Sequence, residues 1–255
     1  MKHSYLLSYN SALKKYTKQV DKQVLNKLLK TIHDDTPSMP RYTAIWDVNK
    51  VLTFISAMRT DNIMLLSQKL ATLLMLLSGN RVNMLTHMHI TEGNMILTDE
   101  ECSFRFTKAL KHTRPGIKND IMTFRSFKEN ISLCPVHTIM KYLQLRSVLC
   151  GDSNLFIRTR PPYAAAHHDT IARWIKTTLK DAGIDTDIYK AHSCRHASTS
   201  AASIGGVSLK TIMGSASWSN DNTFYKHYKK EIDSDDMKDN FGSIILKQFS
   251  VTDVT

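Results

Sequence analysis

Six side chains of this 255-residue chain have the types and the order that metal-free phosphoryl transfer to a tyrosine would need. They are Arg81, Lys111, His192, Arg195, Trp218 and Tyr228. An arginine fork can bind two phosphate oxygens at once, and the ring N–H groups of histidine and tryptophan can donate to the remaining oxygens. A tyrosine hydroxyl can attack phosphorus and hold it as a covalent ester. The sequence therefore indicates chemistry on a phosphodiester.

The two arginines would replace the metal ion that usually neutralises the non-bridging oxygens of a phosphodiester. Arg81 comes directly after an apolar segment, in Ser-Gly-Asn-Arg, and Arg195 closes a His-x-x-Arg motif that begins at His192. In this interpretation the arginines clamp the phosphate, and His192 and Trp218 add neutral donors. Taken singly, Arg81 could instead offset the dipole at a helix end, and Trp218 could be core packing.

The proton donor and the nucleophile each have a rival in the sequence. Lys111 would protonate the leaving oxygen as a general acid, and Lys108 is the alternative. Tyr228 would form a phosphotyrosyl bond, and Tyr225 lies one helical turn away. The order of the motifs favours the functional interpretation, because the His-x-x-Arg is followed by Gly-Gly, a short helix, Trp-Ser and Thr-Phe-x-x-x-Tyr.

Composition limits the possible partners. The chain has 34 Lys+Arg against 23 Asp+Glu, a net charge of +11, which favours a polyanion such as nucleic acid or a membrane surface. The longest apolar segment, 63–77, is interrupted by Ser-Gln-Lys, so it predicts a buried helix and no membrane span. No signal peptide is expected. The four cysteines lack zinc spacing and are predicted to be reduced thiols.

No metal ion and no other cofactor are expected. The pairs His167-His168 and His87-x-His89 stand out among the eleven histidines. In the sequence alone, neither pair has an obvious set of carboxylate or thiolate partners, which a metal site needs.

Periodicity predicts a mostly α protein with a small antiparallel β-sheet (α+β). Helical patterns cover 4–33, 47–59, 61–78, 135–149, 169–182, 192–204 and 209–213. Alternation at period 2 predicts strands at 95–97, 102–106, 121–124 and, briefly, 155–157. Asp61, Asp169 and Ser208 are the expected helix caps. Asp-Asp-Thr-Pro-Ser-Met-Pro at 34–40 predicts a linker and a domain boundary.

The six residues match the signature Arg…Lys…His-x-x-Arg…His/Trp…Tyr, and in this the chain resembles the tyrosine recombinases, the phage-integrase-like family. Ala-His-Ser-Cys-Arg-His-Ala-Ser at 191–198 and Ala-Ser-Trp-Ser-Asn-Asp-Asn-Thr-Phe-Tyr-Lys-His-Tyr at 216–228 look most like the recombinases of DIRS-type retrotransposons and cryptons. Trp218 and Tyr228 are ten residues apart, a spacing that suits this branch. The family often has an acidic residue three positions after the first arginine, where this chain has Met84.

The resemblance implies a tyrosine recombinase catalytic-domain fold over residues 36–255, with a C-terminal tail from about 231. Residues 1–35 would be the remnant of an N-terminal helical domain that clamps DNA. It further implies an enzyme that cleaves and rejoins duplex DNA for recombination or integration, assembles as a tetramer on DNA and works in the nucleus without a cofactor. The alternative is a non-catalytic DNA-binding remnant or domesticated protein, and a type IB topoisomerase would share the same chemistry.

Overall fold

The structure is a computed structural model that describes residues 22–35, 42–106, 121–149, 152–216 and 231–233. The chain divides into two compact units, residues 1–42 and 43–255. In the first unit the described element is helix α2 (Lys22–Asp35). This helix confirms the C-terminal part of the predicted segment 4–33, whose beginning lies outside the described residues. Val24 and Leu28 on α2 are exposed.

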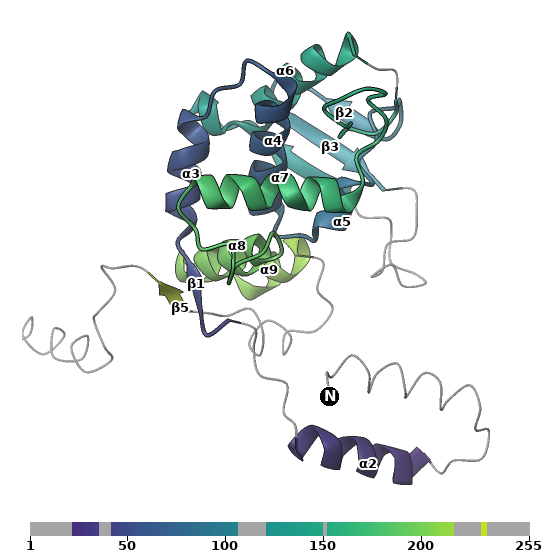
Figure 1. Ribbon diagram of the computed structural model, residues 1–255, viewed down its shortest axis with the longest axis vertical. Helices are drawn as coiled ribbons and strands as arrows, with labels where there is room; N and C mark the ends of the chain where they lie inside the picture. Colours follow the sequence, from purple (N-terminus) through teal and green to yellow (C-terminus); the bar gives the residue numbers. More distant parts are fainter. Residues whose placement is uncertain (1–21, 36–41, 107–120, 150–151, 217–230, 234–255) are drawn as a thin grey trace, which may run out of the picture. The chain divides into compact units, whose positions relative to one another are not determined.

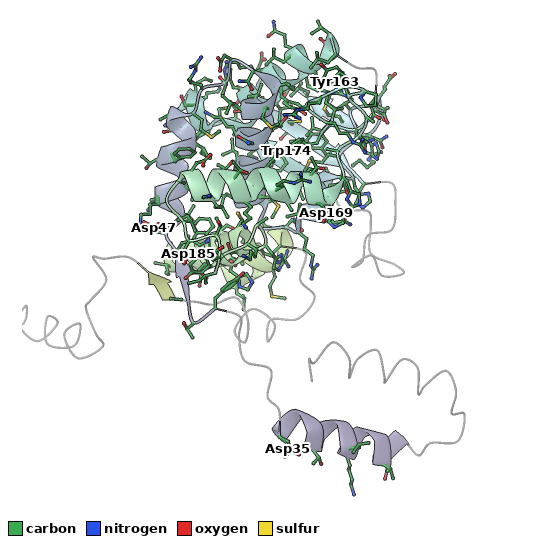
Figure 2. The ribbon with its side chains drawn as sticks, viewed as in Figure 1. Asp35, Asp47, Tyr163, Asp169, Trp174 and Asp185 are labelled. Atoms are coloured by element: carbon green, nitrogen blue, oxygen red, sulfur yellow. The ribbon has the colours of Figure 1, made fainter. Side chains whose placement is uncertain are left out.

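The second unit is organised around helix α4 (Ile63–Ser78), which is buried along most of its length. Four other helices contact it, as Figure 1 lets the reader follow: α3 (Val48–Ala57), α6 (Pro135–Ser147), α7 (His168–Asp181) and α8 (Ser193–Ile204). The apolar face predicted for α7 is inside, and Figure 2 labels Trp174 on it. Trp174 packs against Phe156 with 6.3 Å between ring centroids. The predicted apolar segment 63–77 is thus the helix at the centre of this unit.

A three-stranded antiparallel sheet lies beside these helices. Its strands are β2 (Met95–Leu97), β3 (Glu101–Arg105) and β4 (Ile121–Arg125), in that order. Cys102 pairs with Phe124, and Phe104 pairs with Met122. Cys102 and Phe104 are buried, as the alternation that predicted β3 requires, but Ser103 between them is buried too. The mostly α fold with a small antiparallel sheet is confirmed.

Short elements complete the unit: α5 (Val82–Leu85), the 3-10 helix η1 (Ile131–Leu133), α9 (Leu209–Ser215), β1 (Ala44–Trp46) and β5 (Glu231–Asp233). Strands β1 and β5 form a parallel pair that the sequence did not predict. The predicted strand at 155–157 is wrong, because this segment makes only isolated bridges at Asn154 and Ile157. Across the described residues, no helix is both long and apolar enough to cross a membrane.

Two of the three expected helix caps lie at neighbouring residues. Asn62, and not Asp61, accepts a hydrogen bond from the Leu65 amide at the start of α4. The cap of α7 is His167 in place of Asp169. Ser208 caps α9 as predicted, since its hydroxyl accepts from the Thr211 amide. In each case a neighbouring polar residue can perform the same capping function, so the local sequence did not decide between them.

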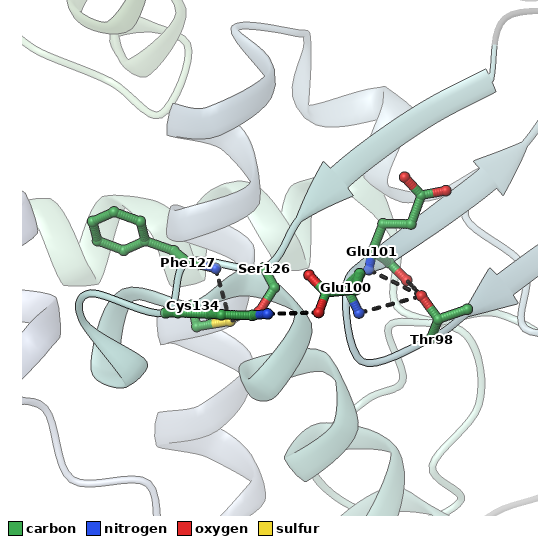
Figure 3. A network of polar contacts seen from close by, with 7 residues as sticks. Thr98, Glu100, Glu101, Ser126, Phe127 and Cys134 are labelled. Carbon is green, nitrogen blue, oxygen red and sulfur yellow. Dashed lines mark hydrogen bonds and ion pairs between the residues drawn. The ribbon is translucent and has the colours of Figure 1, made fainter.

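Cys134 joins the end of the sheet to α6. Its sulfur caps α6 by accepting from the His137 amide at 3.4 Å. The sulfur also accepts from the Phe127 amide just after β4, again at 3.4 Å (Figure 3). Thr98 closes the turn before β3 in the same view, accepting from the amides of Glu100 and Glu101. Burial alone would raise the pKa of the Cys134 thiol. The hydrogen bonds that its sulfur accepts outweigh burial and lower the pKa.

Cys134→Ala should destabilise the protein by about 1 kcal/mol, the usual cost of losing a helix cap, whereas Cys134→Ser should lose less. Because the folded pKa of the thiol lies below its ordinary value of 9.0, the thiolate stabilises the folded state at high pH. That contribution is lost as the pH falls through the folded pKa. Urea unfolding of wild type and Cys134→Ser should therefore show an advantage of the wild type that grows with pH up to about 9. An advantage that shrinks over this range would contradict the prediction.

Candidate active site

The segment Ser78–Arg81 ends α4 and presents the first candidate arginine. Gly79 adopts φ +59°, a left-handed conformation, and its amide donates to the Met75 carbonyl, so it ends the helix as predicted. A Cβ at Gly79 would also lie 3.3 Å from Thr199 Cγ2 on α8. Glycine is therefore needed at position 79 both for the turn and for the close approach of α8. Arg81 follows in extended conformation at the start of α5 and is partly exposed.

Arg195 on α8 reaches this segment. Its guanidinium Nη1 donates to the Gly79 carbonyl at 2.9 Å, across 116 residues of sequence. The contact brings the side chain of Arg195 to a residue only two positions from Arg81. Arg195 is fully buried, so a phosphate can reach its guanidinium only if a neighbouring group moves. The structure thus brings the segments of the two candidate arginines together.

His192 is placed by the same helix. It is the first residue before α8, partly buried, and its ring meets His196 edge-on with 5.6 Å between centroids. His192 and Arg195 are three residues apart on a helical turn, so they lie near the same face. Burial raises the pKa of the neighbouring Cys194 thiol to about 12, so this thiol is neutral at physiological pH and is no competing nucleophile.

Strand β1 fixes the start of α8. The Trp46 indole N–H donates to the buried Ser193 hydroxyl at 2.9 Å, and the Tyr189 hydroxyl donates to the Ala44 carbonyl at 3.3 Å. Strand β5 pairs with β1 and also contacts α8. Three chain segments therefore meet at the helix that carries His192 and Arg195.

Asn80 is a positioning residue that sequence reasoning did not identify. It is 3% exposed, and its side-chain amide donates to the Ser215 carbonyl at the end of α9 at 2.6 Å. Asn80 and Ser215 line one cavity of about 290 Å³ with the beginning of β4, residues 121–124. Nothing in the sequence distinguishes Asn80 from other loop asparagines, since its partner is 135 residues away.

The other three predicted site residues, Lys111, Trp218 and Tyr228, lie outside the described residues, as do the alternatives Lys108 and Tyr225. The described residues that border their segments can be placed. Ile121 resumes the chain after 107–120 and lines the cavity beside Asn80, and Ser215 precedes 217–230. One flank of each segment, Ile121 and Ser215, therefore lies beside Asn80, and β5, which follows 217–230, contacts α8.

Met84 occupies the third position after Arg81. It is buried in α5 and lines the same cavity as Asn80. No carboxylate is therefore available at this position to orient Arg81 or His192.

The expectation that His167 and His168 lack a carboxylate partner is wrong. Their ring nitrogens and an Asp169 oxygen lie within 4.8 Å of one another at the start of α7. His168 Nε2 is 3.0 Å from Asp169 Oδ1, and His167 Nδ1 is 3.2 Å from Asp169 Oδ2. All three side chains are exposed and already contact one another.

No protein-family model matches the chain, and no curated protein matches it either. Several solved structures, in contrast, are similar to it. XerH site-specific recombinase bound to difH substrate, in a pre-cleavage complex, is similar with TM-score 0.56 and 15% identity, over 74% of this chain and 51% of that one. XerA recombinase gives TM-score 0.54 and 17% identity, over 98% and 82% of the two chains.

A lambda integrase(75-356) dimer bound to a COC′ core site gives TM-score 0.53 and 13% identity, over 94% of this chain and 93% of that chain. The chain spans about half the length of the XerH chains. The fold is that of tyrosine recombinase catalytic domains. At these identities the comparisons concern the fold alone.

Asn80→Asp should destabilise the protein by about 1–3 kcal/mol, because a carboxylate oxygen would face the Ser215 carbonyl in a buried site. Urea unfolding measures the loss. Asn83→Asp, an exposed position three residues further on, is the matched control and should stay within about 0.5 kcal/mol of wild type. Equal stability of both variants would show that Asn80 does not hold α9.

The Trp46–Ser193 hydrogen bond should appear as coupling between the two side chains. A double-mutant cycle with Trp46→Phe and Ser193→Ala should give a coupling free energy of about 0.5–1.5 kcal/mol. The coupling is calculated from the free energies of unfolding of the wild type, the two single variants and the double variant. Strictly additive effects would mean that β1 does not fix α8 through this bond.

Proposed function

We propose that this protein cleaves and rejoins duplex DNA through a covalent 3′-phosphotyrosyl intermediate. The observation that carries the proposal is the hydrogen bond from Arg195 to the Gly79 carbonyl, in a fold whose solved relatives are recombinases. It joins the two arginine-bearing segments at one end of α4. Without this junction, two arginines 114 positions apart could not act on one phosphate.

In the proposed reaction Arg81 and Arg195 bind the non-bridging oxygens of the scissile phosphate, and His192 and Trp218 donate to them. The Tyr228 oxygen attacks phosphorus, and the bond from phosphorus to the 5′ oxygen breaks. Lys111 gives its proton to that leaving oxygen, while the tyrosine proton passes to a neighbouring base or to water. Rejoining reverses these steps, so the phosphotyrosyl ester conserves the bond energy and no nucleotide cofactor is needed.

Described residues near two of the three remaining candidates, Trp218 and Tyr228, support this assignment. β5 begins three residues after Tyr228, and three residues span at most about 11 Å. β5 pairs with β1, which is hydrogen-bonded to the start of α8. Asn80 holds Ser215, three residues before Trp218. A catalytic assembly around Arg81 and Arg195 is therefore within reach of both Trp218 and Tyr228.

The finer assignments rest on sequence motifs. We infer a recombinase of the mobile-element type, similar to those of DIRS-type retrotransposons and cryptons, which recombines or integrates DNA in the nucleus. Residues 1–35 would be part of a DNA-clamping domain, and residues 36–255 the catalytic domain with its tail. Self-association on DNA, as a tetramer, is part of the proposal.

A second function is favoured by two observations. Met84 leaves the site without a carboxylate at its position, and Arg195 is fully buried. A protein of this kind could bind DNA through its net charge of +11 without cutting it. It would show binding that weakens steeply with salt and would form no covalent adduct.

A pool of nicked suicide duplexes with a randomised core should trap a covalent protein–DNA adduct in the presence of EDTA. Tyr228→Phe should abolish the adduct because it removes the attacking oxygen, whereas Tyr225→Phe should retain it. Arg81→Ala should slow adduct formation about 10²–10³-fold, the usual effect of removing one donor to the developing charge. Denaturing gel electrophoresis measures all four proteins.

Salt-dependent DNA binding by the wild type without any adduct would favour the non-catalytic function. An adduct that persists in Tyr228→Phe and disappears in Tyr225→Phe would assign the nucleophile to Tyr225. An adduct unaffected by either substitution would contradict the proposed chemistry.

A further inference from the structure

Lys69 is a buried lysine at the centre of the fold, far from the candidate active site. It lies on α4 and is only 4% exposed. About 14 Å of helix separates it from the end of α4 at Ser78, nine residues further on. Within the part of the chain that the structure describes, its ammonium makes no hydrogen bond and no ion pair. Burial lowers the pKa of Lys69, so an anion beside the ammonium would stabilise its charged form.

Lys69 lines a pocket of about 210 Å³ between α3, α4, η1 and α6. Its amine is not among the enclosed, unpartnered polar atoms of the described residues, so it is open to the pocket. A second cation, Lys141 on α6, lines the same pocket, and its amine donates to the Thr60 hydroxyl at 2.5 Å. Burial, and then the charge of Lys141, lowers the pKa of Lys69. The pocket thus holds two cations close enough to repel each other.

Among the described residues, Asp61 is the carboxylate that acts on this pair of cations, and it acts on Lys141 and not on Lys69. Asp61 is near enough for Lys141 to lower its pKa slightly, behind the larger effects of a backbone hydrogen bond and of Arg59. The Asp61 carboxylate is paired with the Arg59 guanidinium at 2.6 Å, and both side chains are exposed. Asp61 therefore offsets only part of the charge of Lys141, and the repulsion that Lys141 exerts on Lys69 remains.

Neutral donors surround the same space. The Ser132 hydroxyl and the His137 imidazole line the pocket, and neither has a hydrogen-bond partner among the described residues. His137 lies in the first turn of α6, whose N-terminal dipole also favours a negative charge. Two ammonium groups, a hydroxyl and an imidazole thus approach one space from three elements.

We propose that this pocket binds a phosphate group or a similar tetrahedral oxyanion, held between Lys69 and Lys141. An oxyanion would accept hydrogen bonds from both ammonium groups and from Ser132 and His137, which matches the donors present. The pocket is several times the volume of one water molecule, about 30 Å³, so it has room for such a group. The site is independent of strand transfer, because it shares no residue with the candidate active site.

Inorganic phosphate is the probe for the test, with the full-length protein and isothermal titration calorimetry. The wild type should bind it saturably, and Lys69→Met should weaken binding about tenfold or more, since a charged hydrogen bond is lost. Lys50→Met, an exposed lysine on α3 outside the pocket, changes the net charge equally and should bind as the wild type does. Lys69→Met should also melt no lower than the wild type, because it removes a buried charge.

Lys141→Met provides a second variant and should weaken binding as well. Equal affinity of the wild type and Lys69→Met would overturn the proposal, and so would an equal loss in Lys50→Met or no saturable binding at all. Competition with a short DNA duplex then identifies the source of the phosphate. Displacement would point to DNA phosphates, and no displacement to free phosphate or a phosphorylated small molecule; either result supports the site.

Discussion

The hydrogen bond between the Arg195 guanidinium and the Gly79 carbonyl is the contact on which the candidate site depends. A guanidinium is costly to bury, so the surrounding structure has to supply acceptors in the right places. The Gly79 carbonyl is one of them, and it is placed by the left-handed turn that ends α4. A side chain at Gly79 would strain that turn and press on Thr199 of α8. The turn, the buried charge and the closeness of α4 to α8 therefore depend on one another.

The surrounding contacts extend this junction to the remaining parts of the site. Asn80 fixes the end of α9, and Trp46 fixes the beginning of α8, each through one buried hydrogen bond to a distant segment. Each bond contributes only about 1 kcal/mol to stability. Their larger effect is on geometry, because an active site assembled from separate loops needs its parts held to within fractions of an ångström.

Helix α4 borders two separate cationic sites. Its C-terminal end leads into Arg81 and meets Arg195, whereas Lys69 lies toward its N-terminal half, in a different pocket with Lys141. A helix packed on most sides can support both, because its backbone hydrogen bonds are satisfied internally and its position is fixed by α3, α6, α7 and α8. A phosphate bound at Lys69 would therefore contact the same rigid element that positions Arg81.

Periodicity and glycine were sufficient for much of the fold. The helix at α4, its stop at Gly79 and the alternating residues of β3 were all predicted, because each depends on local sequence. The β1–β5 pair was not, since it joins two three-residue strands from distant parts of the sequence, whereas the strands of the predicted sheet follow one another along the chain. Asn80 and Lys69 were also missed: one owes its function to a carbonyl 135 residues away, and the other looked only like an interruption of an apolar segment. Distant partners such as these are set by tertiary packing, which no local pattern encodes.

The most direct test of the central claim is an experimental structure of the full chain bound to duplex DNA. The account predicts that one phosphodiester contacts the guanidinium groups of both Arg81 and Arg195, with the Arg195–Gly79 contact retained or replaced by that phosphate. A complex in which the DNA lies elsewhere on the protein, or in which the two arginines contact different phosphates, would contradict it.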